Sequence, residues 1–213
     1  ECVEQWLSLP SIDLLEWQNV LISVFTCASN DFGAVARILS AITCCENLTA
    51  LENFIYEFAI FIVRTVCEPL KIQAESVQMQ GKLSENDFID MEELGAVVTA
   101  IADFASATIR QLCKICLLQN NLSLIDSISS FLCIFSTWPG HYPVDETVSE
   151  GPEVFWNSLK EEVDILEADE KEKLLAVCRP HYAALLQSAV DKIAYPPDSE
   201  LQKNYDKEQM EKL

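Results

Sequence analysis

The chain has 213 residues, half of them hydrophobic, and its 14 Lys and Arg against 34 Asp and Glu give a formal net charge of −20. A surface this acidic repels phosphate backbones and anionic lipid headgroups, which argues against direct nucleic-acid or membrane binding and favours a basic protein partner. Acidity also serves solubility alone, and composition does not separate these two roles. Nine cysteines scattered among apolar residues indicate a reduced cytosolic or nuclear protein, not a disulfide scaffold.

Apolar residues recur at spacings of three and four along most of the chain, which predicts helices throughout and no strands. The most apolar run, residues 58–63, is far shorter than the roughly 20 residues that a membrane-spanning helix needs. In chain order we expect helices over residues 1–8, 12–28, 32–45, 48–79, from about 86 to 118, 122–137, 152–166 and 169–194. Pro69 should kink or break the fourth near Glu68, and Pro180 should interrupt the last. Residues 198–213 are polar and form either a further helix or a disordered tail.

Consecutive helices joined mostly by short loops allow two all-α architectures, a closed bundle or an α-solenoid of antiparallel HEAT-type helix pairs. Several helices carry apolar residues on two faces, as expected where each layer packs against the layers before and after it, and this favours the solenoid. We interpret residues 1–213 as one continuous segment with approximate units 1–46, 47–119, 120–167 and 168–213. Because the sequence opens without Met and ends in a charged run, we expect it to be a fragment of a longer chain.

Two short motifs resemble functional sites but have simpler interpretations. Cys113 and Cys116 have a metal or redox spacing, yet neither histidine lies at ligand spacing from this pair, so we expect two core cysteines one turn apart. Asn47 and Asn121 begin glycosylation sequons, but both also suit the start of a helix, since Asn is a good cap.

The carboxylates cluster in two polar runs, around residues 87–93 and 161–170. Such runs form a solvated face, a docking surface for a basic partner or, if buried with raised pKa values, an acid/base pair. The sequence has no glycine-rich phosphate loop, GxSxG or HExxH motif. We therefore expect no enzyme activity, no cofactor and no metal.

One segment resembles a known family. The run from Trp138 to Thr147, which contains Gly140-His141-Tyr142-Pro143, is similar to a loop inside one repeat of the karyopherin-β (importin-β) family of nuclear transport receptors. The family pattern continues in Phe155-Trp156 with Leu159, then in an acidic stretch, and then in Arg179-Pro180-His-Tyr182. The clear resemblance covers about residues 128–197, and the first half of the chain resembles the family more loosely.

The resemblance implies a superhelical array that shuttles between nucleus and cytoplasm. Its inner, concave helices would hold basic protein cargo and Ran-GTP, and its outer helices would contact phenylalanine-glycine nucleoporins. The main Ran-GTP contacts would lie in repeats outside this segment. The inner helices here would be about 32–45, 86–118 and 152–166, which places seven acidic residues on or beside the concave surface: Asp87, Asp90, Glu92, Glu93, Glu161, Glu162 and Asp164. Two alternatives remain, a helical-repeat scaffold of a stable complex without Ran dependence and an all-α enzyme with a closed bundle.

Overall fold

The computed structural model describes residues 14–28, 31–45, 48, 51–80, 91–139 and 148–193, and these are all-α with no strand. The polar segment 82–90, the expected helix over residues 1–8 and the tail 198–213 lie outside the described residues. The helices are α2 (Leu14–Ala28), α3 (Phe32–Thr43), α4 (Glu52–Ile62), the π-helical η2 (Val63–Cys67), α5 (Glu68–Gln80), α6 (Met91–Leu118), α7 (Ser123–Ser136), α8 (Glu153–Ile165) and α9 (Ala168–Ile193).

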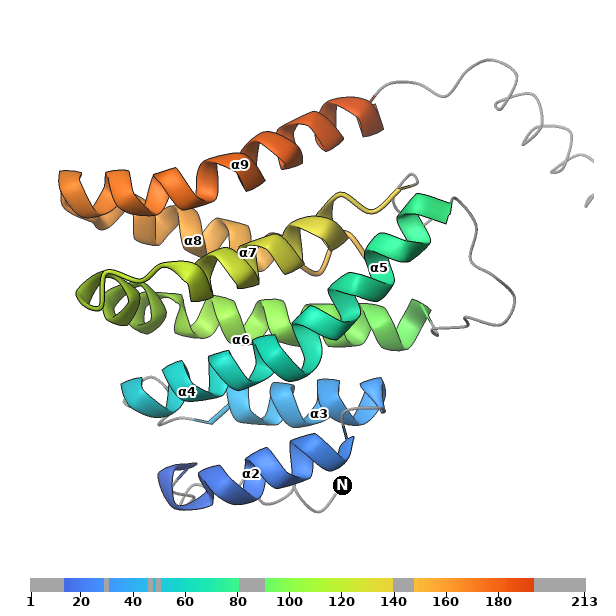
Figure 1. Cartoon of the computed structure of the whole chain (residues 1–213), viewed down its shortest axis with the longest axis vertical. Coiled ribbons are helices and arrows are strands. Elements are labelled where there is room, and N and C mark those ends of the chain that lie inside the picture. The colour runs from blue at the N-terminus through green and yellow to red at the C-terminus, as the bar shows by residue number, and fades with distance from the viewer. Residues whose placement is uncertain are drawn as a thin grey trace, which may run out of the picture.

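The helices form two layers that stack along the long axis of the molecule (Figure 1). One layer contains α3, α6 and α8, where α6 packs against both of the others. The second layer contains α2, the continuous run from α4 to α5, α7 and α9. Because α2 and α9 lie at opposite ends of the stack, the array is open and does not close on itself (Figure 1). This arrangement is an α-solenoid and decides against the closed bundle.

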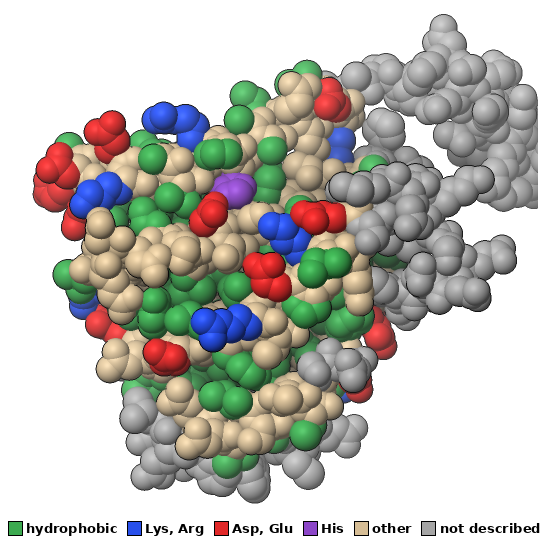
Figure 2. Space-filling view, viewed as in Figure 1, with side chains coloured by type: hydrophobic (Ala, Val, Ile, Leu, Met, Phe, Trp, Pro, Cys, Tyr) green, Lys and Arg blue, Asp and Glu red, His purple; other side chains and the backbone are tan. Residues whose placement is uncertain are grey.

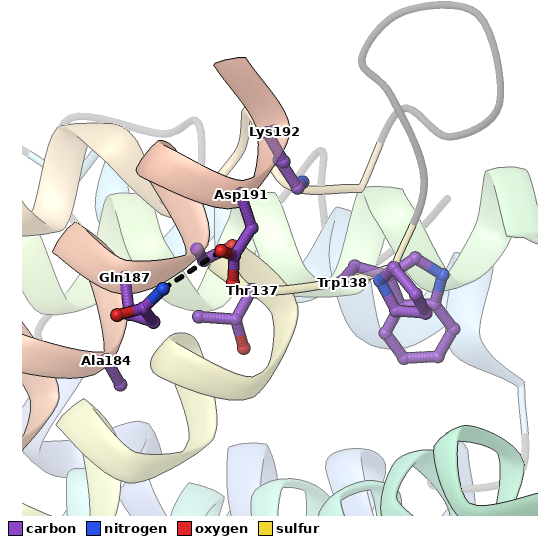
Figure 3. Close-up of a pocket in the computed structure, with 8 residues that line it drawn as sticks. Thr137, Trp138, Ala184, Gln187, Asp191 and Lys192 are labelled. Carbon is purple, nitrogen blue, oxygen red and sulfur yellow. Dashed lines mark hydrogen bonds between the residues drawn. The ribbon is translucent and has the colours of Figure 1, made fainter. Parts of the chain in front are cut away.

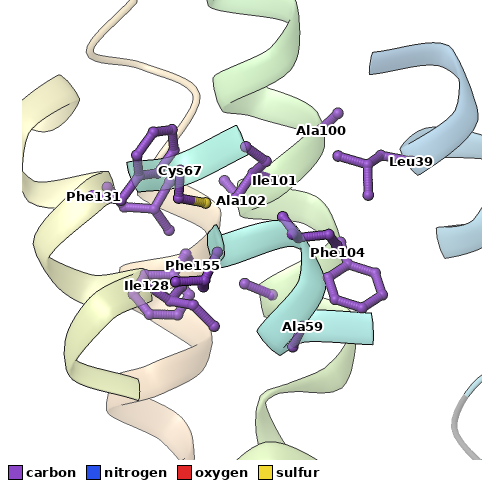
Figure 4. Packing of buried hydrophobic residues seen from close by; sticks show 14 of the residues in the cluster. Leu39, Ala59, Cys67, Ala100, Ile101, Ala102, Phe104, Ile128, Phe131 and Phe155 are labelled. Atoms are coloured by element: carbon purple, nitrogen blue, oxygen red, sulfur yellow. The ribbon is translucent and has the colours of Figure 1, made fainter. Parts of the chain in front are cut away.

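A single apolar core runs between the two layers. Its buried side chains come from every helix in the stack, and Figure 4 shows Leu39 of α3 pointing toward Ala100 of α6 and Phe155 of α8 beside Ile128 of α7. Three aromatic rings connect the N-terminal helices: Phe58 lies 5.8 Å from Phe25 of α2 and 5.7 Å from Phe104 of α6, both edge-on. These edge-to-face pairs stabilise the stacking of successive layers beyond the burial of their area.

The expected kink near Glu68 is confirmed. The α-helical pattern gives way over Val63–Cys67 to a π-helical turn, and Pro69 is the second residue of α5. Proline cannot donate a backbone hydrogen bond, so a wider turn just before it accommodates the missing bond. The change of direction lets α4 pack against α2 while α5 packs against α7.

The expected interruption at Pro180 is wrong, because α9 runs unbroken from Ala168 to Ile193 with Pro180 inside it. A proline in a helix leaves the carbonyl four residues earlier without its partner. Both Pro180 and Ala176, which carries that carbonyl, are exposed, so water can bind the freed oxygen. The local sequence around Pro180 does not show that this face of α9 meets solvent.

Two asparagines shape the turn from α6 to α7. Asn120 adopts a left-handed conformation with φ of 49°, and the amide N–H groups of Asn120 and Asn121 donate to the carbonyls of Leu117 and Cys116. This pattern is a Schellman cap, in which Asn is the usual substitute for Gly. Asn121 Oδ1 then accepts from the Ser123 amide at 3.1 Å, but the N-cap of α7 is Leu122, so Asn121 supports the start of α7 without being its cap. Asn47 lies outside the described residues.

The helix α6 is long and apolar enough, by length and composition, to cross a membrane. Most of its apolar window, 61%, is nevertheless buried within the fold between its neighbours in both layers. A core helix passes the same test of length and hydropathy, and α6 occupies the centre of this stack.

Candidate functional site

The helices α3, α6 and α8 run parallel to one another in one layer. We call the solvent-facing side of this layer the inner face. Arg110 of α6 contacts Glu162 of α8, and Ser106 contacts Ser158, so both pairs are separated by 52 residues. The carboxylate of Glu93 similarly approaches Gly33 of α3. The three helices that the sequence assigned to one layer therefore do lie side by side.

Because the three helices run parallel, their N-terminal turns lie along one edge of the inner face, and these turns carry acidic residues. Glu92 and Glu93 begin α6, Glu153 begins α8, and Asp31 caps α3 by accepting from the Ala34 amide at 2.8 Å. Negative side chains stabilise helix N-termini through the helix dipole, which accounts for their placement without any ligand. Asp87 and Asp90, also predicted for this surface, lie outside the described residues.

The acidic run of α8 divides into three different environments. Glu161 is exposed. Glu162 is almost buried, with 11% of its side chain exposed, and its Oε1 accepts from Arg110 Nε at 2.9 Å. Asp164 accepts hydrogen bonds from Lys171 at 3.1 Å and Lys160 at 3.3 Å, and these bonds lower the pKa of its carboxyl. Two of the three predicted residues are thus already engaged by cations of the chain itself.

Asp103 occupies the middle of α6 on the inner face and was not among the predicted site residues. It is exposed, yet partial burial raises the pKa of its carboxyl above the ordinary value. One pattern in the sequence points to it, because Asp103 falls on the polar stripe of α6 together with Ser106, Arg110 and Lys114. Ser106 and Arg110 are paired with α8, and Lys114 donates to Glu52 of α4 at 2.6 Å.

An aromatic cluster lies between α7, α8 and α9 and unites residues that carry the family resemblance. The Trp156 indole N–H donates to Ser136 Oγ at 2.9 Å, and its ring lies 5.5 Å from that of Tyr182. Trp138 stacks on Phe135 with centroids 5.6 Å apart. Burial raises the pKa of Tyr182 to about 12, so its phenol stays neutral. These contacts give the motif residues a packing role, whereas residues 140–147 of the motif lie outside the described residues.

A groove of about 500 Å³ opens between the end of α7 and the C-terminal half of α9 (Figure 3). Trp138 and Pro139 form one wall, and Gln187 and Asp191 of α9, joined by a 2.9 Å hydrogen bond, form the other. Asp191 accepts from Gln187, and the Thr137 hydroxyl of the lining donates to the carbonyls of Cys133 and Ile134, so neither hydrogen bond activates a nucleophile. We therefore assign no chemistry to this groove.

The cysteines in the described part of the chain are free thiols, and most of them are buried in the core. Cys113 and Cys116 are buried in α6, where burial raises their pKa values to about 12 and about 11, and this confirms that they are core residues. Thiols with such values are poor nucleophiles at neutral pH. Within the described part of the chain no group of His, Cys, Asp and Glu side chains could hold a metal ion.

The chain is similar to importin-13 of several vertebrates. The chain is 24% identical to importin-13 of Gallus gallus over 204 residues, which is 94% of this chain. It is 35% identical over 83 residues to importin-13 of Homo sapiens and to that of Mus musculus. These matches support an importin-like, karyopherin-β-type relationship. No protein-family profile matches the chain.

The chain spans only 19% of the length of the chicken importin-13 that it matches. The similarity therefore concerns one part of that larger protein. It also agrees with the fold, since the described residues form an open helical solenoid. The matches do not distinguish importin-13 from other receptors of the karyopherin-β type.

Proposed function

We propose that this chain is a segment of an importin-13-type nuclear transport receptor and contributes to a superhelix that carries protein cargo between cytoplasm and nucleus. The observation that carries the proposal is the similarity to importin-13 over 94% of the chain, on a sequence that folds as an open solenoid. Importin-13 is preferred over relatives such as transportin-3 because the similar proteins named above are importin-13 of three species.

In this proposal the inner face receives basic protein cargo. Acidic residues outnumber basic ones 34 to 14 in the whole chain, and the exposed carboxylates of Glu92, Glu93 and Glu161 all belong to the inner-face layer. A field of one sign speeds the encounter with cargo of the opposite sign, and its effect falls with ionic strength. Asp87 and Asp90 precede α6 in the sequence and extend the same acidic set.

The remaining partners follow from the same family. Ran-GTP would bind mainly through repeats outside this segment and would change cargo affinity by competition or coupling. The outer layer, which contains α4, α7 and α9, would face phenylalanine-glycine nucleoporins. Figure 2 views the molecule from this side and shows hydrophobic side chains at the surface among charged ones. The segment would catalyse no reaction and would need no cofactor or metal, and the receptor would shuttle between nucleus and cytoplasm.

The test is Ran-GTP binding by the longer protein that we propose contains this chain, and by residues 1–213 alone, each with and without a Lys- and Arg-rich protein cargo. We expect strong Ran-GTP binding by the longer protein, together with a change in cargo affinity, and weak Ran-GTP binding by the isolated segment. If the longer protein binds no Ran-GTP, the transport proposal fails. The chain would then be better explained as part of a scaffold that holds its partners constitutively.

A further inference from the structure

Two adjacent cysteines at the C-terminal end of α3 are both reachable from solvent. Cys44 is exposed, Cys45 is half-buried, and both are free thiols. The third accessible thiol in the described part of the chain, Cys27, has no cysteine beside it in the sequence. The remaining described cysteines are buried: Cys67, Cys113, Cys116, Cys133 and Cys178. Among the described residues, two accessible thiols therefore occur side by side only in the turn after α3.

The backbone holds this pair in a defined turn. Cys44 is the C-cap of α3, with φ of −78° and ψ of −3°, and its amide donates to the Ser40 carbonyl at 3.1 Å. The Cys45 amide donates to the Ile42 carbonyl at 3.1 Å, and the Cys45 carbonyl accepts from the Leu48 amide at 3.1 Å. These hydrogen bonds fix the main chain on both sides of the pair, so only side-chain rotation is needed to bring the two sulfur atoms onto one ligand.

The two thiols act on one another. The Cys45 thiol donates a weak hydrogen bond to the Ala41 carbonyl, with Sγ and O 3.4 Å apart. Burial raises the pKa of Cys45, and the neighbouring Cys44 raises it further, so Cys45 remains a protonated thiol at neutral pH. Metal ions bind cysteine as the thiolate. A ligand that takes up two neutral thiols therefore suits this pair better than a metal cation does.

Neighbouring cysteines are too close for a relaxed disulfide but suit a bridging atom. The Cα atoms of consecutive residues are about 3.8 Å apart across a trans peptide. Disulfides usually join Cα atoms about 4.4–6.8 Å apart, and shorter separations strain the bond. An atom placed between the two sulfurs lengthens the bridge and relieves this constraint. The pair is thus better suited to closing a ring around one thiophilic atom than to oxidation.

We propose that Cys44 and Cys45 together form a binding site for trivalent arsenicals of the type R–As=O. Each thiol gives up its proton, the arsenic-bound oxygen leaves with both protons as water, and two As–S bonds form. Arsenic stays trivalent, so the step needs neither an oxidant nor a reductant. The second As–S bond closes within one molecule, and such linkage strengthens binding by about 10²–10⁴-fold over a single attachment. The proposal is independent of nuclear transport and stands or falls without it.

The experiment titrates residues 1–213 with phenylarsine oxide in excess glutathione, a monothiol that competes with single cysteines, and detects the adduct by intact-protein mass spectrometry. Brief alkylation of the native protein with iodoacetamide then locates the protected thiols. Trypsin cleaves after Arg37 and Arg64 and releases residues 38–64, a peptide whose only cysteines are Cys44 and Cys45. We expect the arsenical to protect this peptide from alkylation, and dithiothreitol, which chelates arsenic itself, to reverse the protection.

Three serine variants separate the pair from a single reactive thiol. Cys44→Ser and Cys45→Ser should each raise the half-saturating concentration of phenylarsine oxide by roughly 10²-fold or more. A serine at position 45 can still donate to the Ala41 carbonyl, and circular dichroism should show the wild-type helix content. Cys27→Ser, the matched loss of an exposed thiol, should leave binding unchanged. Wild-type binding by either pair variant, protection of Cys113 in place of residues 38–64, or no adduct on the wild type would each overturn the site.

Discussion

Gly151 provides a sharp test of how closely α8 is set against α6. A Cβ added to this residue would lie 3.2 Å from the Cα and 3.3 Å from the Cβ of Thr99, and still closer to its hydroxyl oxygen. Thr99 belongs to the 28-residue helix α6, whose backbone cannot move aside for one side chain. The turn before α8 would have to retreat instead. Overpacking of this kind costs about 1–3 kcal/mol, and we expect Gly151→Ala to lower the free energy of unfolding by that amount.

Gly95 is the matched control because it lies in α6 itself and an added Cβ there meets nothing within 4 Å. Alanine is favoured over glycine inside a helix by about 1 kcal/mol, so Gly95→Ala should stabilise the protein. The same chemical change thus has opposite signs at two positions. Urea unfolding followed by circular dichroism at one pH and temperature measures both variants against the wild type.

Thr99→Ala isolates the contact that is responsible. It removes the hydroxyl oxygen but leaves Cα and Cβ in place, so it should restore only part of the stability lost in Gly151→Ala. The double-mutant cycle should give a coupling energy of about 0.5–2 kcal/mol between the two positions. Wild-type stability of Gly151→Ala, or a coupling energy of zero, would show that the loop does not press against α6 as the structure places it.

Three further outcomes follow from the packing and charges. Leu174→Ala should lower the free energy of unfolding by about 2–5 kcal/mol because Leu174 is fully buried. Leu186→Ala on the same helix, at 68% exposure, should change the free energy of unfolding by less than about 0.5 kcal/mol in the same urea titration. Trp156→Phe removes the indole donor to Ser136 and should cost about 1 kcal/mol; thermal unfolding of Ser136→Ala should show a similar loss, and the double variant should lose less than the sum. The pKa of Asp164 lies below its ordinary 3.8, so its ion pairs stabilise the fold above that pH and are lost as pH falls through the lower folded value; Asp164→Asn should therefore flatten the acid limb of a stability–pH curve, and an unchanged limb would refute the pairing.

Helices and their order could be predicted from the sequence because apolar periodicity records which side of each segment is buried. The third helix was expected over residues 32–45 and runs from Phe32 to Thr43, and the helix expected over 122–137 runs from Ser123 to Ser136. Pro180 marks the limit of this local reasoning. Whether a proline breaks a helix depends on whether water can reach the freed carbonyl, and that is a property of the assembled stack.

The environments of the acidic residues could not be predicted in the same way. Glu161, Glu162 and Asp164 read as one solvated run, since their spacing contains no information about partners. Arg110, the partner of Glu162, is 52 residues away, and Lys171, one partner of Asp164, belongs to the next helix. A sequence with only helical periodicity specifies faces, but not the register between one helix and the next.

The parallel register of α3, α6 and α8 explains why the inner face differs from a uniformly acidic surface. Parallel helices bring their N-termini to the same edge, so first-turn carboxylates such as Glu93 and Glu153 collect there for reasons of helix stability alone. Further along, Glu162 is engaged by Arg110. Asp103 in the middle of α6 belongs to neither group, since partial burial raises the pKa of its carboxyl and it contacts no cation among the described residues. The acidity of the inner face therefore combines carboxylates that stabilise helix N-termini with carboxylates that pair with cations of the chain, and the net charge of the sequence distinguishes neither set.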